Sequence, residues 1–348
     1  VVIQVTDGAN TDTITVTVNV QDVNEAAPVF TAGETATATP NENQQAVGTY
    51  AATDADGTAT QTYSILTAEQ NAASVDHDLF SVAGGGVLTF QASPNYEDAG
   101  CGSGDDSNTC AVVIQVTDGA NTDTITVTVT VQDLNDETPA FTSSGTPSIN
   151  ENVRNVLTLA ASDTDAGDSA TFAITGGADS ELFEIDGGTT LRFAAAAGAN
   201  YESPGDAGTN NEYVVVVTAT DTGANAVAQT ITITIQDVNE FSPVFGDGDT
   251  ATATPNENQQ AVGTYAATDA DGTATQTYSI LTAAQNAASV DHDLFSVASG
   301  GVLTFATAPN YESAGCGSGD DSNTCVVVIQ VTDGDNTDTI TVTVNVQD

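Results

Sequence analysis

The sequence predicts an all-β protein made of tandem β-sandwiches with about seven strands each. One observation is a period of two: Ile14, Val16 and Val18 alternate with threonine or asparagine, as in a half-buried antiparallel strand. Another is that such runs recur about every 10 residues, with glycine- and asparagine-rich turns between them. The third is an internal repeat that runs the length of the chain. A short turn is expected within 68–78, and no helix.

A repeated aspartate marks the internal repeat. It follows glutamine each time, and its copies are 111, 104 and 111 residues apart, at Asp22, Asp133, Asp237 and Asp348. The segment PNENQQAVGTYAATDADGTATQTYSIL occurs twice, at 40–66 and at 255–281. We therefore expect four parts: the C-terminal hairpin of a preceding repeat at 1–22, full repeats at 23–133 and 238–348, and between them a diverged repeat without cysteine at 134–237.

The leading fragment, 1–22, corresponds to the last two strands of a repeat whose first five strands are missing. A two-stranded hairpin is marginally stable alone in water, and its open edges invite further strands. We expect either a longer native protein or a filament in which a neighbouring chain completes the hairpin. In both cases the hairpin should lie outside the sandwich formed by 23–133.

The charge of the chain is extreme. Its 48 Asp and Glu residues stand against two arginines, Arg154 and Arg192, and the net charge is −46. Such a surface excludes nucleic acid, which needs basic residues, and anionic membranes. Bound divalent cations or a salty medium would relieve the repulsion. No apolar run approaches the roughly 18 residues of a membrane span, so this segment is not expected to insert into a membrane.

Four cysteines form two local pairs, Cys101 with Cys110 and Cys316 with Cys325, each inside the sequence CGSGDDSNTC. The spacing within a pair is too long for a zinc knuckle, whose cysteines are separated by about two to four residues. An even number of cysteines in local pairs favours two disulfides and an oxidising, extracellular location. A metal or redox role is the alternative.

Five acidic motifs recur in the same order in every repeat. In the first full repeat they are NEN, DADG, NYE, TDG and DLND, at 41–43, 54–57, 95–97, 117–119 and 133–136. Because no lysine neutralises these carboxylates, they favour a hard cation. An excess of oxygen ligands suits calcium better than magnesium, which demands octahedral geometry. The alternative is solvated loop charge in a halophilic protein.

These motifs resemble those of cadherin repeats, and the resemblance covers essentially the whole chain. The linkers DVNEAAPVF, DLNDETPAF and DVNEFSPVF, at 22–30, 133–141 and 237–245, are similar to the DxNDxxPxF linker of that family. The resemblance implies tandem seven-stranded Greek-key β-sandwiches of the cadherin/Ig-like type in a linear rod. It also implies calcium between successive repeats, bound by Glu motifs of the upstream repeat, by Asp and Asn of the linker, and by the DxD pair and an isolated Asp of the downstream repeat.

Carried over motif by motif, the resemblance implies four sets of calcium ligands, one at each of two complete junctions and one at each of two half-junctions. The upstream half-junction comprises Asp22, Asn24, Glu25, Asp54, Asp56 and Asp118. The first junction comprises Glu42, Glu97, Asp133, Asn135, Asp136, Asp163, Asp165 and Asp221. The second junction comprises Glu151, Glu202, Asp237, Asn239, Glu240, Asp269, Asp271 and Asp333. The downstream half-junction comprises Glu257, Glu312 and Asp348.

The chain departs from the family pattern at several positions. Asn95, Asn200 and Asn310 stand where the family has Asp in its DxE motif, which removes one negative charge from each junction. Glu25 and Glu240 replace the last linker Asp, and their longer side chains can still ligate a cation. Tryptophan is absent, so the strand-swap adhesion of vertebrate members is not implied.

No catalytic group stands out. His77 and His292 lie singly in SVDHDLFSV, and the middle repeat lacks the histidine, so a plain loop role is favoured. We expect no enzyme but a calcium-rigidified extracellular structural or adhesive rod or filament, similar to prokaryotic-type adhesins with cadherin-like repeats. Its expected partners are calcium and its own copies or further repeats, with cell-surface glycans as another candidate. The alternative is a carbohydrate- or ligand-binding cell-surface module, although aromatic platforms for sugars are scarce.

Overall fold

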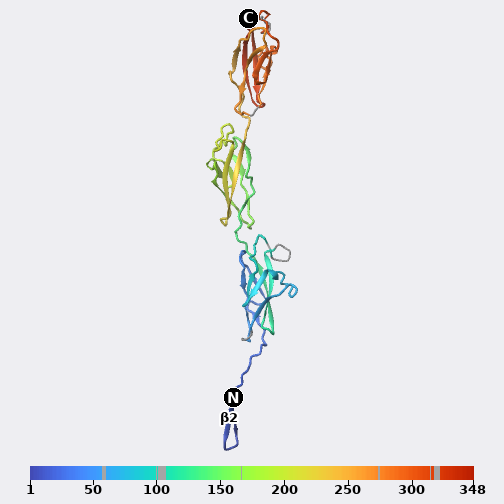
Figure 1. Ribbon diagram of the computed structural model, residues 1–348, viewed down its shortest axis with the longest axis vertical. Helices are drawn as coiled ribbons and strands as arrows, with labels where there is room; N and C mark the ends of the chain where they lie inside the picture. Colours follow the sequence, from blue (N-terminus) through green and yellow to red (C-terminus); the bar gives the residue numbers. More distant parts are fainter. Residues whose placement is uncertain are drawn as a thin grey trace. The chain divides into compact units, whose positions relative to one another are not determined.

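The computed structural model describes residues 1–56, 60–98, 100, 107–165, 167–272, 275–313, 315–316 and 322–348. In these residues the regular structure consists of β-strands and short 3₁₀ turns, as the alternating sequence predicts. No helix among them has the length and apolar character needed to cross a membrane. Figure 1 colours the chain from the N-terminal hairpin in blue to the last sandwich in red.

The chain forms two compact units. The first unit consists of Val1–Ala140, Ala161–Ala170 and Thr220–Val227. The second unit consists of Phe141–Ala160, Thr171–Ala219 and Ala228–Asp348. All ligand candidates of the first junction therefore belong to the first unit, and all those of the second junction belong to the second unit.

The N-terminal hairpin consists of β1 (Val2–Thr6) and β2 (Thr11–Thr15), which pair antiparallel with each other and with no other described strand. Figure 1 labels β2. Valine and isoleucine side chains of the hairpin are exposed, for example Ile14 at 62%. The half-buried strand expected to run from Ile14 to Val20 is therefore wrong in this copy. Its ladder ends at Thr15, and beyond it Val16 and Val1 exchange two further bonds, at 2.8 and 2.9 Å.

The first sandwich follows the hairpin and is made of nine strand segments. They are β3 (Val29–Phe30), β4 (Thr35–Ala38), β5 (Ala46–Thr49), β6 (Ala52–Thr53), β7 (Thr62–Ile65), β8 (Phe80–Ala83), β9 (Val87–Phe90), β10 (Thr109–Thr117) and β11 (Thr122–Thr130). The sheets have the orders β4-β11-β10-β7, β5-β9-β8 and β3-β6. Segments β3 and β4 are halves of one broken strand, as are β5 and β6, so the expected seven strands are confirmed.

The second and third sandwiches repeat this plan. The second contains β12 (Ala140–Phe141), β13 (Ser148–Asn150), β14 (Asn155–Thr158), β15 (Ala161–Ser162), β16 (Thr171–Gly176), β17 (Phe183–Asp186), β18 (Thr190–Phe193), β19 (Glu212–Thr220) and β20 (Ala226–Gln236). The third contains β21 (Val244–Phe245), β22 (Thr250–Ala253), β23 (Ala261–Thr264), β24 (Ala267–Thr268), β25 (Thr277–Ile280), β26 (Phe295–Ala298), β27 (Val302–Phe305), β28 (Thr324–Thr332) and β29 (Thr337–Asn345). The 3₁₀ turns are η1 (His77–Leu79), η2 (Ser180–Leu182), η3 (His292–Leu294), η4 (Ser299–Gly301) and η5 (Tyr311–Ser313).

Each sandwich has its own hydrophobic core, built from the residues that alternate with threonine. In the ladder of β10 with β11, Ile114 lies opposite Ile125 and Val112 lies opposite Val127. All four side chains are fully buried. The hairpin β1–β2 has nearly the same sequence as this ladder, so its exposed residues are of the kind that a sandwich buries. Alternation predicts the face on which a side chain lies, and burial then depends on whether a second sheet covers that face.

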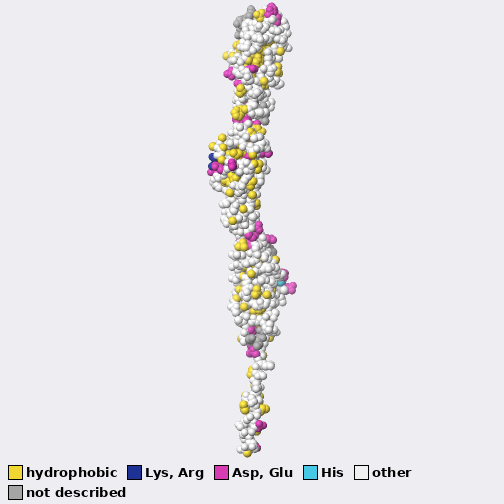
Figure 2. Space-filling model, turned by 60° about the vertical axis from the view of Figure 1, so that its left-hand side comes forward, with side chains coloured by type: hydrophobic (Ala, Val, Ile, Leu, Met, Phe, Trp, Pro, Cys, Tyr) yellow, Lys and Arg dark blue, Asp and Glu magenta, His cyan; other side chains and the backbone are white. Residues whose placement is uncertain are grey.

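Both arginines lie in the second sandwich. Arg154 and Arg192 contact the same Glu184 oxygen at 2.9 and 2.7 Å, and Arg192 also contacts Asp186 at 2.7 Å. In Figure 2 they form the dark blue spot beside magenta acidic side chains. The only arginines of the chain are thus paired with acids of one sheet, and their ion pairs in the described residues include no carboxylate of a junction.

The cysteine-containing loop precedes β10 and β28. Cys316 and Cys325 form a disulfide with their Cα atoms 4.7 Å apart, as the sequence predicts. Cys110 is also disulfide-bonded, and its expected partner Cys101 lies outside the described residues. In the middle repeat the buried Asp206 closes the corresponding loop, because its carboxylate accepts backbone N–H groups of Asn210 and Asn211 at 3.0 and 3.1 Å.

Candidate calcium sites at the junctions

At the first and second junctions the glutamate of the NEN motif connects two segments of backbone. Glu42 is 1% exposed, and its two carboxylate oxygens accept N–H groups of Tyr96 at 2.7 Å and of linker residue Leu134 at 2.8 Å. At the second junction Glu151 accepts N–H groups of Tyr201 and Val238, both at 2.9 Å. The NEN glutamate therefore holds the NYE loop and the linker together at the end of its sandwich.

The second aspartate of each DxD pair fixes the other end of the linker. Asp165 accepts the N–H of Glu137 at 3.1 Å, and Asp271 accepts that of Phe241 at 2.8 Å. Asp56 makes the equivalent bond to Ala26 at the upstream half-junction. Each linker is thus held by backbone bonds to a downstream acid, and those of the first and second junctions are also held by an upstream glutamate, so the acids of neighbouring motifs approach one another.

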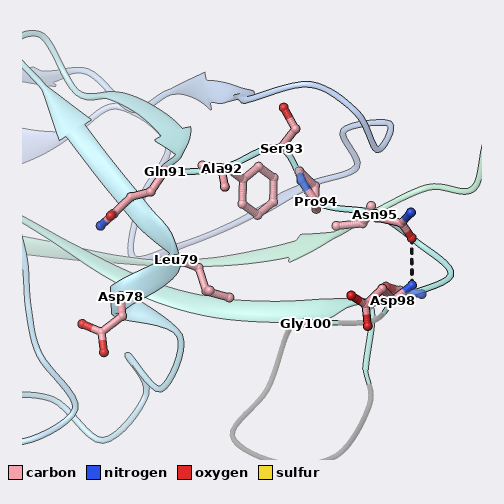
Figure 3. A pocket seen from close by; sticks show the side chains of 12 residues that line it. Asp78, Leu79, Gln91, Ala92, Ser93, Pro94, Asn95, Asp98 and Gly100 are labelled. Atoms are coloured by element: carbon pink, nitrogen blue, oxygen red, sulfur yellow. Dashed lines mark hydrogen bonds between the residues drawn. The ribbon is translucent and has the colours of Figure 1, made fainter.

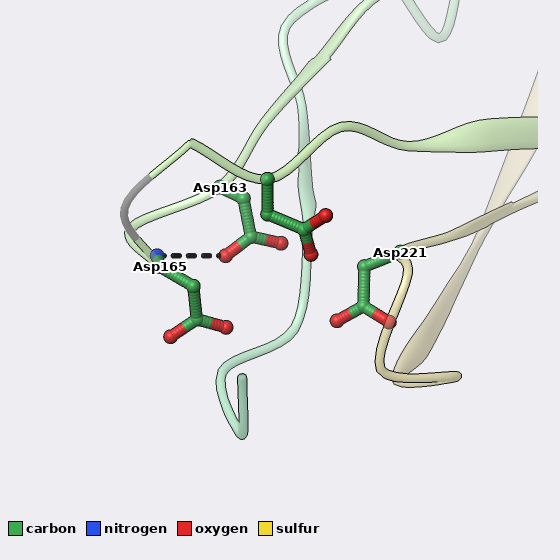
Figure 4. A group of neighbouring side chains, drawn as sticks. Asp163, Asp165 and Asp221 are labelled. Atoms are coloured by element: carbon green, nitrogen blue, oxygen red, sulfur yellow. Dashed lines mark hydrogen bonds between the residues drawn. The ribbon is translucent and has the colours of Figure 1, made fainter. Parts of the chain in front are cut away.

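At the first junction the candidate ligands form three overlapping groups, in each of which one oxygen per residue lies within 4.8 Å of the others. The groups are Glu42, Glu97 and Asp133; Glu97, Asp136 and Asp165; and Asp163, Asp165, Asp168 and Asp221. Figure 4 shows Asp163, Asp165 and Asp221 turned toward one another, with the Asp165 N–H donating to Asp163. Asn135 belongs to the same linker and contacts the third group through Asp168.

Several oxygens in these groups are buried and have no hydrogen-bond donor among the described residues. They include both oxygens of Glu97, Oδ2 of Asp163 and Oδ1 of Asp165. A buried carboxylate without a partner costs several kcal/mol in ionised form. A hard cation with six to eight oxygen ligands would satisfy such atoms, so the residues present at the first junction fit calcium.

Burial and neighbouring negative charge both raise the pKa values of acids in these groups. Burial raises the pKa of Glu97 to about 7, and the neighbouring Glu42, Asp133 and Asp165 add to the rise. Burial also raises the pKa of Asp165, with contributions from Asp163 and other acids. Without a cation, a proton is the simplest counter-charge available to these carboxyl groups, and bound calcium would replace it.

The second junction repeats the upstream part of this arrangement. Glu151, Glu202 and Asp237 form one group within 4.8 Å, and burial, followed by the nearby Glu151, raises the pKa of Glu202. Glu240 accepts a hydrogen bond from Asn152 at 3.0 Å. Further oxygens without a donor among the described residues belong to Asn239, Asp269 and Asp333. Asp271 is the remaining candidate ligand of the second junction, and its carboxylate accepts the linker N–H of Phe241.

The half-junctions are less complete. Glu257, Glu312 and Asp348 form a group within 4.8 Å. At the upstream half-junction the structure describes Asp22, Asn24 and Glu25 on an exposed linker, where no such group forms with the described Asp54, Asp56 and Asp118. Hydrogen bonds from Asn121, Ala120 and Asn24 nevertheless lower the pKa of Asp118.

The structure also shows two kinds of junction residue that the motif comparison missed. The first is the second asparagine of NEN, because Asn43 donates to Asp136 at 2.6 Å. This asparagine occurs in all three repeats, and that recurrence could have identified it from the sequence. The second is Asp168, which lies three residues beyond a DxD pair and has no acidic counterpart in the other repeats. An acid unique to one repeat could not be found by matching repeats to one another.

The histidines belong to none of these acidic groups, and each sandwich has a pocket that borders its NYE motif through Asn95, Asn200 or Asn310. His77 Nδ1 contacts the Ser74 carbonyl at 3.0 Å, and His292 contacts Ser289 in the same way. Figure 3 shows a pocket of about 370 Å³ in the first sandwich, lined by Leu79, Phe90 and Asp78 among others. Equivalent pockets of about 310 and 410 Å³ occur in the other two sandwiches. The histidine is absent from the middle repeat, whereas the pocket is common to all three.

Comparisons with known proteins agree with this architecture. No protein-family model matches the chain. Human Protocadherin-16 is 31% identical over an alignment of 261 residues, and the match covers 66% of this chain and 7% of that protein. Human Protocadherin Fat 1 is 29% identical over an alignment of 255 residues, and the match covers 68% of this chain and 5% of that protein. The chain thus spans less than a tenth of the length of these relatives.

Solved structures show the same fold. Mouse Cadherin-23 EC22-24 matches with a TM-score of 0.59 and 19% identity, over 93% of this chain and 100% of that one. Mouse clustered PcdhgC3 EC1-3 matches with a TM-score of 0.60 and 19% identity, over 90% of this chain and 99% of that one. The relatives belong to a non-enzymatic adhesion family, in agreement with the expectation that the chain is no enzyme. The chain is therefore a cadherin-repeat protein, an array of three tandem cadherin-like β-sandwich domains that follows the β1–β2 hairpin.

Proposed function

We propose that the chain is part of an extracellular adhesive or structural rod whose joints are stiffened by calcium. The observation that carries this proposal is the burial of the Glu97 carboxylate among other acids. Both of its oxygens are buried without a donor among the described residues, in two groups shared with Glu42, Asp133, Asp136 and Asp165. Calcium would supply there the positive charge that the chain itself lacks.

The residues of the first and second junctions would act as a clamp on each linker. Glu42 and Asp165 hold the linker backbone on either side of the Glu97 group, and Glu151 and Asp271 do the same at the second junction. The ligands of one group come from segments far apart in sequence, so they converge only when the linker is ordered. A cation that binds only this geometry shifts the equilibrium toward it, and the joint stiffens.

The wider role of the rod is also a proposal. We propose that the junction ligands are the residues assigned above by motif, that the repeats continue in a longer array or associate with copies of the chain, and that the protein lies at a cell surface as a stalk, adhesin or filament. The two disulfide motifs, one of them seen as a bond, support an oxidising location. A prokaryotic-type source and binding of surface glycans stay predictions, since the relatives named above are human.

The test is a calcium titration of the chain followed by small-angle scattering and thermal unfolding. We expect the maximum dimension to reach a constant, extended value and the unfolding temperature to rise as calcium is added, with a much weaker response to magnesium at equal ionic strength. A chain whose dimensions and unfolding temperature stay constant from calcium-free buffer to millimolar calcium would contradict the proposal.

A further inference from the structure

The second repeat departs from its neighbours at two places on its upstream side. After the DxD pair it reads AGDSAT, where the first and third repeats read GTATQT, so Asp168 is an additional acid. Its isolated aspartate is followed by Thr-Gly-Ala-Asn, whereas the others have Gly-Ala-Asn or Gly-Asp-Asn, so Thr222 is an insertion. These two departures are 54 residues apart in the sequence.

In the structure the two departures meet. The Thr222 hydroxyl donates to Asp168 Oδ1 at 2.7 Å, and the Ser169 N–H donates to the same oxygen at 2.7 Å. The side-chain amide of the linker residue Asn135 donates to Asp168 Oδ2 at 2.6 Å and to the Thr222 hydroxyl at 3.0 Å. Charge-assisted bonds of this length are among the stronger hydrogen bonds in proteins.

The rest of the inserted loop closes around the same asparagine. Asn225 donates its side-chain amide to Asn135 Oδ1 at 3.0 Å and to Asp221 at 2.8 Å. A side chain at Gly223 would overlap the Asn135 side chain, because a Cβ atom there would lie only 2.7 Å from Asn135 Cγ. Glycine at 223 therefore lets the loop approach the linker closely, and every polar atom of the Asn135 side chain has a partner.

The other linker asparagines are held differently. Asn24 donates to the isolated aspartate Asp118 at 3.1 Å, and Asn239 helps to lower the pKa of the corresponding Asp333. Oδ1 of Asn239 is buried with no donor among the described residues. Among the described residues, the second junction thus offers no donor to Oδ1 of its linker asparagine, whereas the first junction satisfies Asn135 through Asp168, Thr222 and Asn225.

We propose that Asp168, Thr222 and Gly223 form a clasp on Asn135 that keeps the first linker ordered when calcium is removed. Asp168 is a positioning residue in this scheme, since it acts by fixing Asn135. The bonds of the clasp join protein groups alone, so its order does not depend on a cation. The two joints then differ: the second becomes ordered only with calcium, and the first retains order at low calcium. The inference rests on the proposed function only in treating both linkers as joints that calcium orders.

Hydrogen–deuterium exchange of the full chain, in calcium-free buffer and in saturating calcium, tests the clasp. Without calcium, backbone amides in 134–137 should exchange about tenfold more slowly than those in 238–241, roughly the protection expected from one charge-assisted hydrogen bond. Thr222→Val, which removes the hydroxyl at constant charge, and Gly223→Ala, which displaces Asn135, should each abolish that difference. Thr124→Val, on β11 outside the clasp, should preserve it.

Different exchange results would contradict the clasp and the proposed calcium-dependent function. Equal exchange of the two linkers in calcium-free wild type would overturn the clasp, as would unchanged protection of 134–137 in Thr222→Val and Gly223→Ala. Saturating calcium should slow exchange in both linkers of the wild type and of Thr222→Val. If calcium slows neither linker, the proposed function fails, whatever the clasp does. Asp168→Asn adds a check, because its new amide would face that of Asn135 and should abolish the protection as well.

Discussion

Asn43 donates its side-chain amide to Asp136 at 2.6 Å, across 93 residues of sequence. The equivalent pair at the second junction is Asn152 with Glu240 at 3.0 Å. Each of these asparagines has a positive φ, 61° for Asn43 and 58° for Asn152, a conformation that asparagine tolerates better than most residues. One asparagine thus turns the chain beside the NEN glutamate and orients the last acid of the linker.

Replacing this asparagine by glycine removes the amide but keeps the backbone freedom. We expect Asn43→Gly to weaken calcium binding at the first junction about three- to tenfold, the loss of one hydrogen bond to a charged group, while the thermal unfolding of the calcium-free chain changes little. Asn258→Gly is the matched control, since φ is 60° there and its side chain has no hydrogen bond among the described residues. Isothermal titration with calcium measures the effect, and equal losses in both variants would contradict it.

A neutral residue in place of Glu97 should have opposite effects with and without calcium. Glu97→Gln removes a buried charge that Glu42, Asp133 and Asp165 repel, so the calcium-free chain should unfold at a higher temperature near pH 8. It also removes a candidate ligand, so calcium affinity at the first junction should fall by about tenfold or more. Thermal unfolding scans in chelator should show a higher unfolding temperature for Glu97→Gln than for the wild type, and scans in calcium should show a smaller rise on adding calcium. A variant that is destabilised equally in both buffers would show that Glu97 is only a packing residue.

The sequence predicts the sandwiches well because the information is local. The alternation in TITVTVTV gives the buried Ile125 and Val127 of β11 directly, and the repeat of NEN, DADG and NYE predicts which acids meet. Asp168 could not be predicted, because its role depends on contacts with Thr222 and Asn135 that are distant in sequence. The exposed Ile14 was mispredicted for a related reason: the same sequence is core in β11 and surface in β2, and only the covering sheet differs.

The disulfide and Asp206 should stabilise equivalent loops by different means. Reduction of Cys316–Cys325, or its replacement by a pair of serines, should destabilise the third sandwich by about 2–3 kcal/mol, the chain-entropy estimate for a loop of this length. Asp206→Ala should destabilise the middle sandwich under both oxidising and reducing conditions, because the N–H groups of Asn210 and Asn211 lose their acceptor. Urea unfolding with and without reductant checks this, and a middle sandwich that responds to reductant would contradict it.

The pH dependence of the calcium-free chain follows from Glu97. Its carboxyl has a pKa of about 7 in the fold, against an ordinary value of 4.5, so the folded state holds this proton more tightly than the unfolded chain does. Below about pH 4.5 the group is protonated in both states and has no effect on stability. As pH rises from 4.5 through 7, the unfolded chain ionises first, and the fold loses stability.

We therefore expect the urea midpoint of metal-free protein to fall between pH 5.5 and pH 8. Burial also raises the pKa of Glu202 and Asp271, so these acids act in the same direction. Glu97→Gln isolates one contribution, because the difference between its midpoint and that of the wild type should widen as pH rises. Saturating calcium should remove most of this fall in the urea midpoint, because the bound cation then neutralises the carboxylates in place of the proton. A wild-type midpoint that rises with pH in metal-free buffer, or a constant difference from Glu97→Gln, would show that Glu97 is ionised throughout.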